Sequence, residues 1–299
     1  MTANLPHKKF LFATDFLESS RLALDYAVAL AHHYQARLLI VHVFHLPQAA
    51  TEAEALDGPS ISRLSREKRL EMFAQGIRRA GVEAEWRLIE GWMPEALLAQ
   101  VQEVQPDLLV LGTHGVYRGL GHMLIGSNAE EMLLSAPCPT LTVGRHVPGG
   151  IGPESAPDYI LYITDFTPES AAAAPYAVAL SHDFHARLDI CHVLPDGSAD
   201  NEQIRHQRAE EYCDAVERLL PAAAAAWCVP GKQLEHGATK QEILRRTQTD
   251  AMGLIVLGVK PESQFARHVH SSLAYELIAT AACPVFTIRG QGANQPWGA

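Results

Sequence analysis

The chain has 299 residues, of which 47% are hydrophobic and 19% charged, and its formal net charge is −10 at pH 7. This length exceeds what a single hydrophobic core usually supports, so we expect two domains. The acidic balance argues against nucleic acid or an anionic membrane as the main partner. Because no apolar stretch approaches the roughly 18 residues of a membrane span, we expect a cytoplasmic protein.

An internal repeat divides the chain. Residues 26–43 and 176–193 share 12 of 18 residues at an offset of 150, and the offset falls to 145 at Cys138 and Cys283. This pattern indicates a tandem duplication. We therefore expect a first domain, a Gly- and Pro-rich linker, a second domain and a tail, with the bounds 1–146, 147–157, 158–290 and 291–299.

Strands and helices are expected to alternate along the first half. Buried apolar runs predict strands at 9–14, 37–44, 82–90, 108–111 and 138–145. Helical spacing predicts helices that start at Ser19 or Ser20 and that cover 61–80, 94–104 and 127–136. Strands that alternate with helices in this way are typical of a parallel sheet built from right-handed βαβ units.

The second half repeats this order. Its strands are expected at 159–164, 187–194, 228–236, 253–258 and 284–289. Its helices are expected at 169–184, 201–220, 239–248 and 271–281. Because Pro175 lies inside the first of these helices and lacks an N–H group, we expect a kink or a late helix start there.

A glycine-rich stretch between the fourth strand of the first half and the next helix is the main candidate binding element. No acidic residue lies between Asp107 and Glu130, although the protein is acidic overall. Glycine N–H groups, a capping side chain and nearby cationic side chains would together suit a polyphosphate. The residues that could supply these groups are Gly112, His114, Gly115, Arg118, Gly126, Ser127 and Asn128. The alternative is that the glycines only make a tight turn.

Asp15 follows the first strand and should face this glycine-rich loop, because the carboxyl ends of parallel strands meet at one edge of the sheet. Its carboxylate could accept a hydrogen bond from a ribose hydroxyl or an adenine amine. The alternative is that Asp15 only caps the following helix.

Other catalytic signatures are missing from the sequence. There is no P-loop and no nucleophile elbow, and neither the cysteines nor the histidines have the spacing of a metal site. We therefore interpret the five cysteines as reduced structural thiols and expect no metal. His42 and His192 lie inside apolar strands at equivalent positions and should be hydrogen-bonded core residues.

An ordered set of motifs resembles the universal stress protein family in its tandem form. The motifs are Thr14-Asp15-Phe16, His42-Val43, Gly91, Gly126-Ser127 and Ala136-Pro137-Cys138-Pro139. The resemblance implies two open five-stranded parallel sheets of strand order 3-2-1-4-5, with helices on both faces. It also implies an ATP-binding stress-response or regulatory protein.

The resemblance further implies how a nucleotide would be held. Asp15 and Val43 would hold the adenine and ribose, and Gly112, Gly115, Gly126 and Ser127 would hold the phosphates. The ligand could be ATP, ADP or AMP, and Mg²⁺ could accompany ATP. This chain has ten residues between Gly115 and Gly126 where the family pattern has nine, and we expect binding to survive because Gly119 and Gly121 could absorb the extra residue.

The second half keeps only part of the family pattern. Asp165, Val193 and Gly258 are present, whereas Pro261 and Ser271 replace two glycines of the loop. Arg267 could partly compensate. Because proline lacks a backbone donor and serine adds a side chain, we expect this second site to be weak or empty.

Several functional alternatives remain open from the sequence. The last strand of each half mediates dimerisation in the family, so we expect the halves to pack as an internal pseudo-dimer, and a homodimer through the same strands is a second possibility. An unknown protein partner is also expected. The protein could instead be a slow ATPase or a self-phosphorylating enzyme that uses Ser127 or Thr113. It could also be a nucleotide-free scaffold for a protein or a small hydrophobic ligand.

Overall fold

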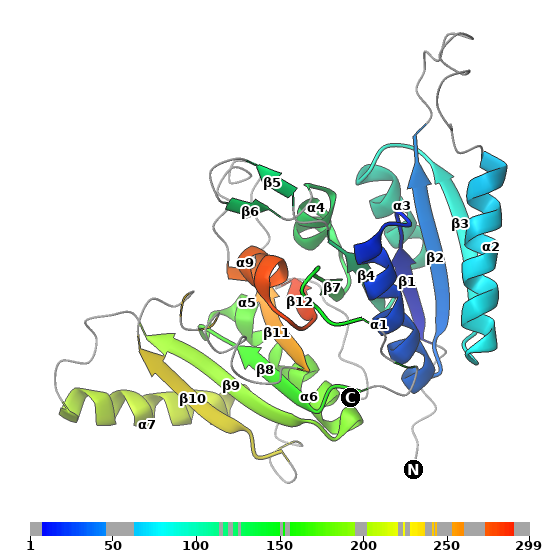
Figure 1. Cartoon of the computed structure of the whole chain (residues 1–299). Helices are drawn as coiled ribbons and strands as arrows, with labels where there is room; N and C mark the ends of the chain where they lie inside the picture. The colour runs from blue at the N-terminus through cyan, green and yellow to red at the C-terminus, as the bar shows by residue number, and fades with distance from the viewer. Residues whose placement is uncertain are drawn as a thin grey trace.

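The structure is a computed structural model, which describes residues 8–45, 63–113, 116–118, 122–124, 127–149, 152, 156–194, 202–220, 224, 228–236, 241, 243, 253–259 and 273–289. Within these residues, strands alternate with helices in two successive halves (Figure 1). The fold is therefore of the α/β class that the sequence predicts.

The first half follows the predicted order of elements. Its strands are β1 (Lys9–Ala13), β2 (Arg37–Phe44), β3 (Ala84–Glu90), β4 (Leu108–Gly112), β5 (Val116–Arg118), β6 (His122–Leu124) and β7 (Thr140–Val143). Its helices are α1 (Glu18–Tyr34), α2 (Arg63–Arg79), α3 (Glu95–Val104) and α4 (Ser127–Ser135).

The second half repeats this arrangement. Its strands are β8 (Tyr159–Ile163), β9 (Arg187–Leu194), β10 (Gly231–His236), β11 (Leu254–Val259) and β12 (Val285–Arg289). Its helices are α5 (Pro168–Ala171), α6 (Ala174–Phe184), α7 (Glu202–Leu219) and α9 (Leu273–Thr280). The break between α5 and α6 confirms the late helix start predicted at Pro175, which lies in the first turn of α6.

One continuous sheet of ten strands runs through the molecule in the order β10-β9-β8-β11-β12-β7-β4-β1-β2-β3. Each half contributes five parallel strands in the order 3-2-1-4-5. The halves join through β7 and β12, which pair antiparallel with Leu141 opposite Phe286. These two residues are repeat equivalents at an offset of 145, so a pseudo-two-fold axis passes between them. The predicted internal pseudo-dimer is thus confirmed, with its two sheets merged into one.

The same pairing overturns the expectation of a homodimer through the last strands. β7 lies between β4 and β12, and β12 lies between β11 and β7, so neither strand has an edge left for a second copy. The edge strands of the described sheet are β3 and β10.

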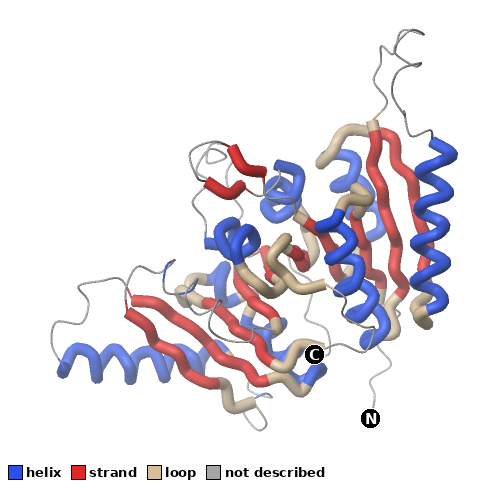
Figure 2. The backbone as a smooth tube through the Cα atoms, in the orientation of Figure 1, coloured by secondary structure: helices blue, strands red, loops and turns tan. Residues whose placement is uncertain are grey.

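Helices cover both faces of the sheet (Figure 2). On one face, α1, α2, α6 and α7 pack over a single buried cluster that extends across both halves. On the other face, α3 and α4 cover the first half, and α9 covers the second. Leu133 of α4 joins the cluster of the second half, so the halves also share side-chain packing on this face. The continuity of both layers across the β7–β12 junction makes the two halves one packed unit.

Two local predictions differ from the structure. Helix α1 starts at Glu18 rather than at Ser19 or Ser20, and its N-cap residue, Leu17, makes no side-chain capping bond. The stretch expected as a plain loop after β4 contains a hairpin, in which β5 and β6 pair antiparallel with Arg118 opposite His122. Residues 119–121, which connect these strands and include the glycines expected to absorb the extra residue, lie outside the described residues.

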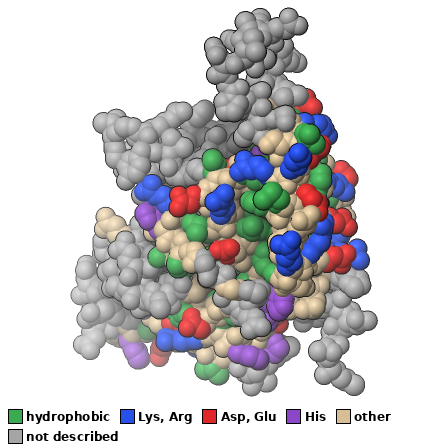
Figure 3. All heavy atoms as spheres, turned by 45° about the vertical axis from the view of Figure 1, so that its right-hand side comes forward, with side chains coloured by type: hydrophobic (Ala, Val, Ile, Leu, Met, Phe, Trp, Pro, Cys, Tyr) green, Lys and Arg blue, Asp and Glu red, His purple; other side chains and the backbone are tan. Residues whose placement is uncertain are grey.

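Charged side chains of both signs are interspersed on the face that carries α2 (Figure 3). The described helices include none that is long and apolar enough to cross a membrane.

Candidate functional site

The loop between β1 and α1 presents Asp15 at the carboxyl edge of the sheet. Thr14 is buried, and its Oγ1 accepts a hydrogen bond from the N–H of Phe16 at 3.0 Å. The same oxygen lies 3.1 Å from Oγ of Ser20 at the start of α1. Asp15 itself is exposed. The buried hydroxyl groups of the loop therefore fix the backbone on both sides of an accessible carboxylate.

Phe16 holds this loop in an uncommon conformation. Its φ is 64°, in the left-handed region that non-glycine residues seldom adopt. The ring is buried and packs 4.4 Å from the ring of His42, measured between centroids. Burial of the aromatic ring thus offsets the cost of this backbone conformation.

The carboxylate of Asp15 shapes the turn that leads into helix α1. Its Oδ1 accepts a hydrogen bond from the N–H of Leu17 at 2.9 Å, and Leu17 precedes the helix. This bond closes a local turn between residues that are two positions apart in the sequence. The carboxylate therefore shapes the loop while it remains at the sheet edge.

His42 is a satisfied core histidine, as predicted. Its Nδ1–H donates to the carbonyl oxygen of Thr14 at 2.7 Å, so its Nε2 accepts from Nη1 of Arg66 at 2.9 Å. Burial lowers the pKa of His42, and Arg66 and Arg69 lower it further. The imidazole is therefore held neutral between the β1–α1 loop and α2.

Two arginines of α2 belong to this edge and were missed by the sequence reasoning. The guanidinium of Arg69 lies over the ring of Phe16 at 4.3 Å, and that of Arg66 lies over the ring of Phe44 at 5.2 Å. The Arg69 guanidinium is therefore close to Asp15, which precedes Phe16, and the Arg66 guanidinium is close to the end of β2, which Phe44 forms. The signal was available, since Arg63, Arg66 and Arg69 are spaced by three residues and must share one face of a helix.

Gly112 has a packing role that the sequence does not reveal. A Cβ atom at this position would collide with the backbone carbonyl oxygen of Ser19, in the first turn of α1. Gly258 of the second half meets Glu169 and Ser170 in the same way. These glycines let α1 and α5 approach the ends of the buried strands β4 and β11, so each has a structural reason that does not require a phosphate.

The described residues cover the predicted site only in part. Thr14, Asp15, Val43 and Gly112 lie at the carboxyl ends of β1, β2 and β4, where the sheet brings them to one edge. The backbones of Arg118, Ser127 and Asn128 belong to β5 and α4. His114, Gly115 and Gly126 lie outside the described residues.

The second half builds the same loop around Asp165. Phe166 has a φ of 60°, its N–H donates to Oγ1 of Thr164 at 3.0 Å, and His192 Nδ1–H donates to the Thr164 carbonyl oxygen at 2.8 Å. Oδ1 of Asp165 accepts from the hydroxyl of Thr167 at 2.6 Å. The loop geometry is therefore a property of the repeat.

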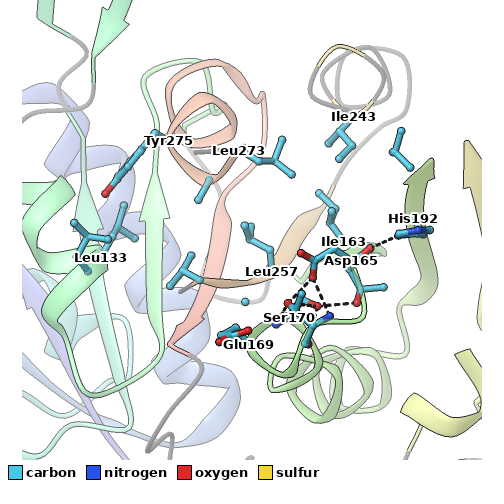
Figure 4. A pocket seen from close by; sticks show the side chains of 17 residues that line it. Leu133, Ile163, Asp165, Glu169, Ser170, His192, Ile243, Leu257, Leu273 and Tyr275 are labelled. Carbon is cyan, nitrogen blue, oxygen red and sulfur yellow. Dashed lines mark hydrogen bonds between the residues drawn. The ribbon is translucent and has the colours of Figure 1, made fainter. Parts of the chain in front are cut away.

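A cavity of about 420 Å³ opens at this edge of the second half. Figure 4 shows Leu133 and Tyr275 on one side of the space and Asp165 and His192 on the other. The cavity follows the ends of β8, β9 and β11, and α4 and α9 close its apolar side. The site that the sequence predicted to be weak or empty thus lies beside a sizeable open cavity.

The described residues contain no cluster of three or more His, Cys, Asp or Glu side chains that could hold a metal ion. All five cysteines are free thiols. Burial raises the pKa of Cys138 and of Cys283 to about 12, so both are poor nucleophiles.

Known proteins with similar sequences belong to one family. A model of the universal stress protein family matches residues 6–144 and 158–289. A universal stress protein of Thermus aquaticus is 33% identical over 141 residues, which is 46% of this chain and 98% of that protein. A second, from Methanocaldococcus jannaschii, is 29% identical over 143 residues, which is 46% of this chain and 83% of that protein.

Solved structures share the two-half architecture. A universal stress protein from Archaeoglobus fulgidus matches with a TM-score of 0.65 at 19% identity and covers 94% of this chain and 98% of that one. A structure described as a putative universal stress protein from Pseudomonas aeruginosa matches with a TM-score of 0.67 at 17% identity, covering 95% of this chain and 93% of its own. At such identities these two likenesses bear on the fold alone.

Proposed function

Because the chain belongs to the universal stress protein family, we propose that its first half binds ATP and that the protein acts as a nucleotide-dependent stress-response or regulatory module. One observation carries this proposal. The exposed carboxylate of Asp15 shares the carboxyl edge of the sheet with two arginines of α2 and with the strand that leads into the glycine-rich stretch. An acceptor for a ribose or an amine and a source of positive charge are then available at one edge of the sheet.

Each described residue of this edge has a role in the proposed binding of a nucleotide. Asp15 would accept from a ribose hydroxyl, and the main chain near Val43 would meet the adenine. Arg66 and Arg69 would attract the phosphates, which are also expected to contact N–H groups of the glycine-rich stretch. Mg²⁺ would arrive with ATP, bound through the phosphates.

The same geometry gives little support to catalysis by Thr113. Its side chain is only 3% exposed, and its N–H donates to the carbonyl oxygen of Val143 at 3.0 Å. His42 is neutral and has both ring nitrogens engaged, so it is a poor general base at this edge. We therefore propose a binding role, with any hydrolysis or self-phosphorylation slow.

Equilibrium dialysis of the full chain against ATP, ADP and AMP tests this function. We expect ATP to bind, and the ranking of the three ligands to show how much the phosphates contribute. Absence of binding at millimolar ATP would overturn the proposal. Incubation with γ-labelled ATP, with Ser127→Ala as a control, separates binding from turnover, because a binding protein should release little labelled phosphate and retain no covalent label.

A further inference from the structure

The cavity of the second half has an apolar side that the first half does not share in sequence. Leu273 stands where the first half has Asn128, and Tyr275 stands where it has Glu130, both at an offset of 145. Both side chains line the cavity together with Leu257 of β11. Two polar positions of the repeat have thus become part of an apolar wall.

The first half also contributes to this wall. Leu133 and Leu134 of α4 line the cavity, and Leu133 is buried in the core cluster of the second half. The cavity is therefore composed of residues from both halves. A test of its ligand must use the full chain.

The opposite end of the cavity is acidic. Asp165 and Glu169 line it, and the described lining residues include no lysine or arginine. A phosphate placed here would meet two carboxylates and, among these residues, no compensating cation. This end instead suits a ligand that donates hydrogen bonds or carries a positive charge.

The arginines of helix α2 are also absent from the equivalent positions of helix α7, which faces this edge of the second half. At an offset of 146, Arg63, Arg66 and Arg69 of α2 correspond to Ala209, Tyr212 and Ala215 of α7. The structure supports this alignment, because Tyr212 stacks on His192 with ring centroids 6.3 Å apart, whereas Arg66 bonds to the equivalent His42. Three arginines beside the first-half edge are thus replaced by uncharged residues at the equivalent positions of the second half.

We propose that the second half is a binding site for a small apolar amine. The ammonium group pairs with Asp165, and the hydrocarbon body fills the space between Leu273, Tyr275 and Leu133. A volume of about 420 Å³ accommodates a body of one or two fused rings or a short branched chain. This site lies at the ends of β8, β9 and β11, whereas the proposed nucleotide site lies at the ends of β1, β2 and β4.

Three probes with one hydrocarbon body test this proposal: 1-naphthylmethylamine, 1-naphthalenemethanol and 1-naphthoate. In calorimetric titrations of the full chain we expect the amine to bind about tenfold or more tightly than the carboxylate, with the alcohol between them. ATP at a saturating concentration should leave the amine affinity unchanged. A carboxylate that binds as tightly as the amine, the absence of amine binding, or displacement of the amine by ATP would each overturn the proposal.

Two variants locate the site. Asp165→Asn should reduce the preference for amine over carboxylate to about threefold or less, and Leu273→Arg, which adds a cation to the wall, should reverse it. Glu85→Gln removes an exposed carboxylate of β3 in the first half and should change nothing. Circular dichroism shows whether each variant is folded. The three probes on the unmodified chain test the preference for an amine even if no variant folds. An unchanged preference in folded Asp165→Asn would contradict the proposed site.

Discussion

Arg66 donates a hydrogen bond to Nε2 of His42 at 2.9 Å, and in the second half Tyr212 stacks its ring on the equivalent His192. The two histidines themselves make the same bond to the β-strand end, to Thr14 and Thr164 respectively. The repeat therefore keeps the loop that presents an aspartate and changes the charge of the helix beside it. This difference underlies the proposal of two sites with different ligand chemistry.

Replacement of Arg69 should weaken ATP binding. The Arg69→Gln variant loses a cation at the edge that carries Asp15, and we expect the dissociation constant to rise about tenfold. Arg69→Lys keeps the charge and should lose less. Arg79→Gln, at the far end of the same helix, is the matched control and should bind as the unmodified chain does. Equal affinities for Arg69→Gln and Arg79→Gln would remove Arg69 from the site.

His42 should titrate below its ordinary pKa of 6.5, because burial and the neighbouring arginines disfavour the imidazolium. The unfolded chain then binds a proton first as the pH falls through 6.5, so this residue makes the folded state less stable under acid conditions. Arg66→Gln should raise the pKa of His42. NMR titration of the ring protons, assigned with His42→Gln, measures the effect, and a pKa at or above 6.5 in the unmodified chain would contradict it.

Gly112→Ala should destabilise the protein by about 1–3 kcal/mol, because the added methyl group would collide with the backbone of Ser19. Gly76→Ala is the matched control. Gly76 lies in α2 with open space where a Cβ would be, so the same change there should stabilise the protein by about 0.5–1 kcal/mol. Urea unfolding followed by circular dichroism gives both values. Similar effects at the two positions would show that close packing does not explain Gly112.

The stability of the protein should depend on alkaline pH through a contact at the junction between the halves. Nζ of Lys8 lies 3.8 Å from the ring centroid of Tyr34, whose hydroxyl donates to Asp183 of the second half at 2.8 Å. Burial lowers the pKa of Lys8 from 10.5 to about 8, although Asp183 and Asp107 oppose this shift. The unfolded chain therefore binds more protons between these two values, and stability should rise with pH in that window.

Tyr34 should limit the rise in stability at the upper end of this pH window. Burial and Asp183 raise the pKa of Tyr34, so the unfolded chain loses the phenolic proton first above pH 10 and stability should then fall. Lys8→Met removes the charge and should abolish the rise. The free energy of unfolding, measured from pH 7 to 11 in both proteins, tests this, and parallel curves would contradict it.

Much of the fold could be predicted from the sequence because its signals are local and repeated. β2 and β9 have the predicted bounds, since each is a mostly apolar stretch in a strand that is covered on both faces. The internal pseudo-dimer was predicted from family resemblance, and the antiparallel pairing of Leu141 with Phe286 confirms it.

The parts that were missed depend on contacts between distant segments. The packing of Gly112 against Ser19 and the position of Arg69 over Phe16 both require a helix docked on the sheet. The cavity of the second half was likewise hidden, because Leu133 enters its wall from the other half. Comparison of the two halves in sequence shows the lost glycines, but only the assembled structure shows the cavity beside Asp165.

The stoichiometry of ATP binding tests the central asymmetry most directly. Calorimetric titration of the full chain should give one ATP per chain, and Gly115→Val or Gly126→Val should abolish the signal while circular dichroism remains unchanged. Asp165→Asn should leave the stoichiometry at one. A stoichiometry of two ATP molecules per chain would contradict nucleotide binding by the first half alone. So would the binding of one ATP that survives either glycine substitution and is lost in Asp165→Asn.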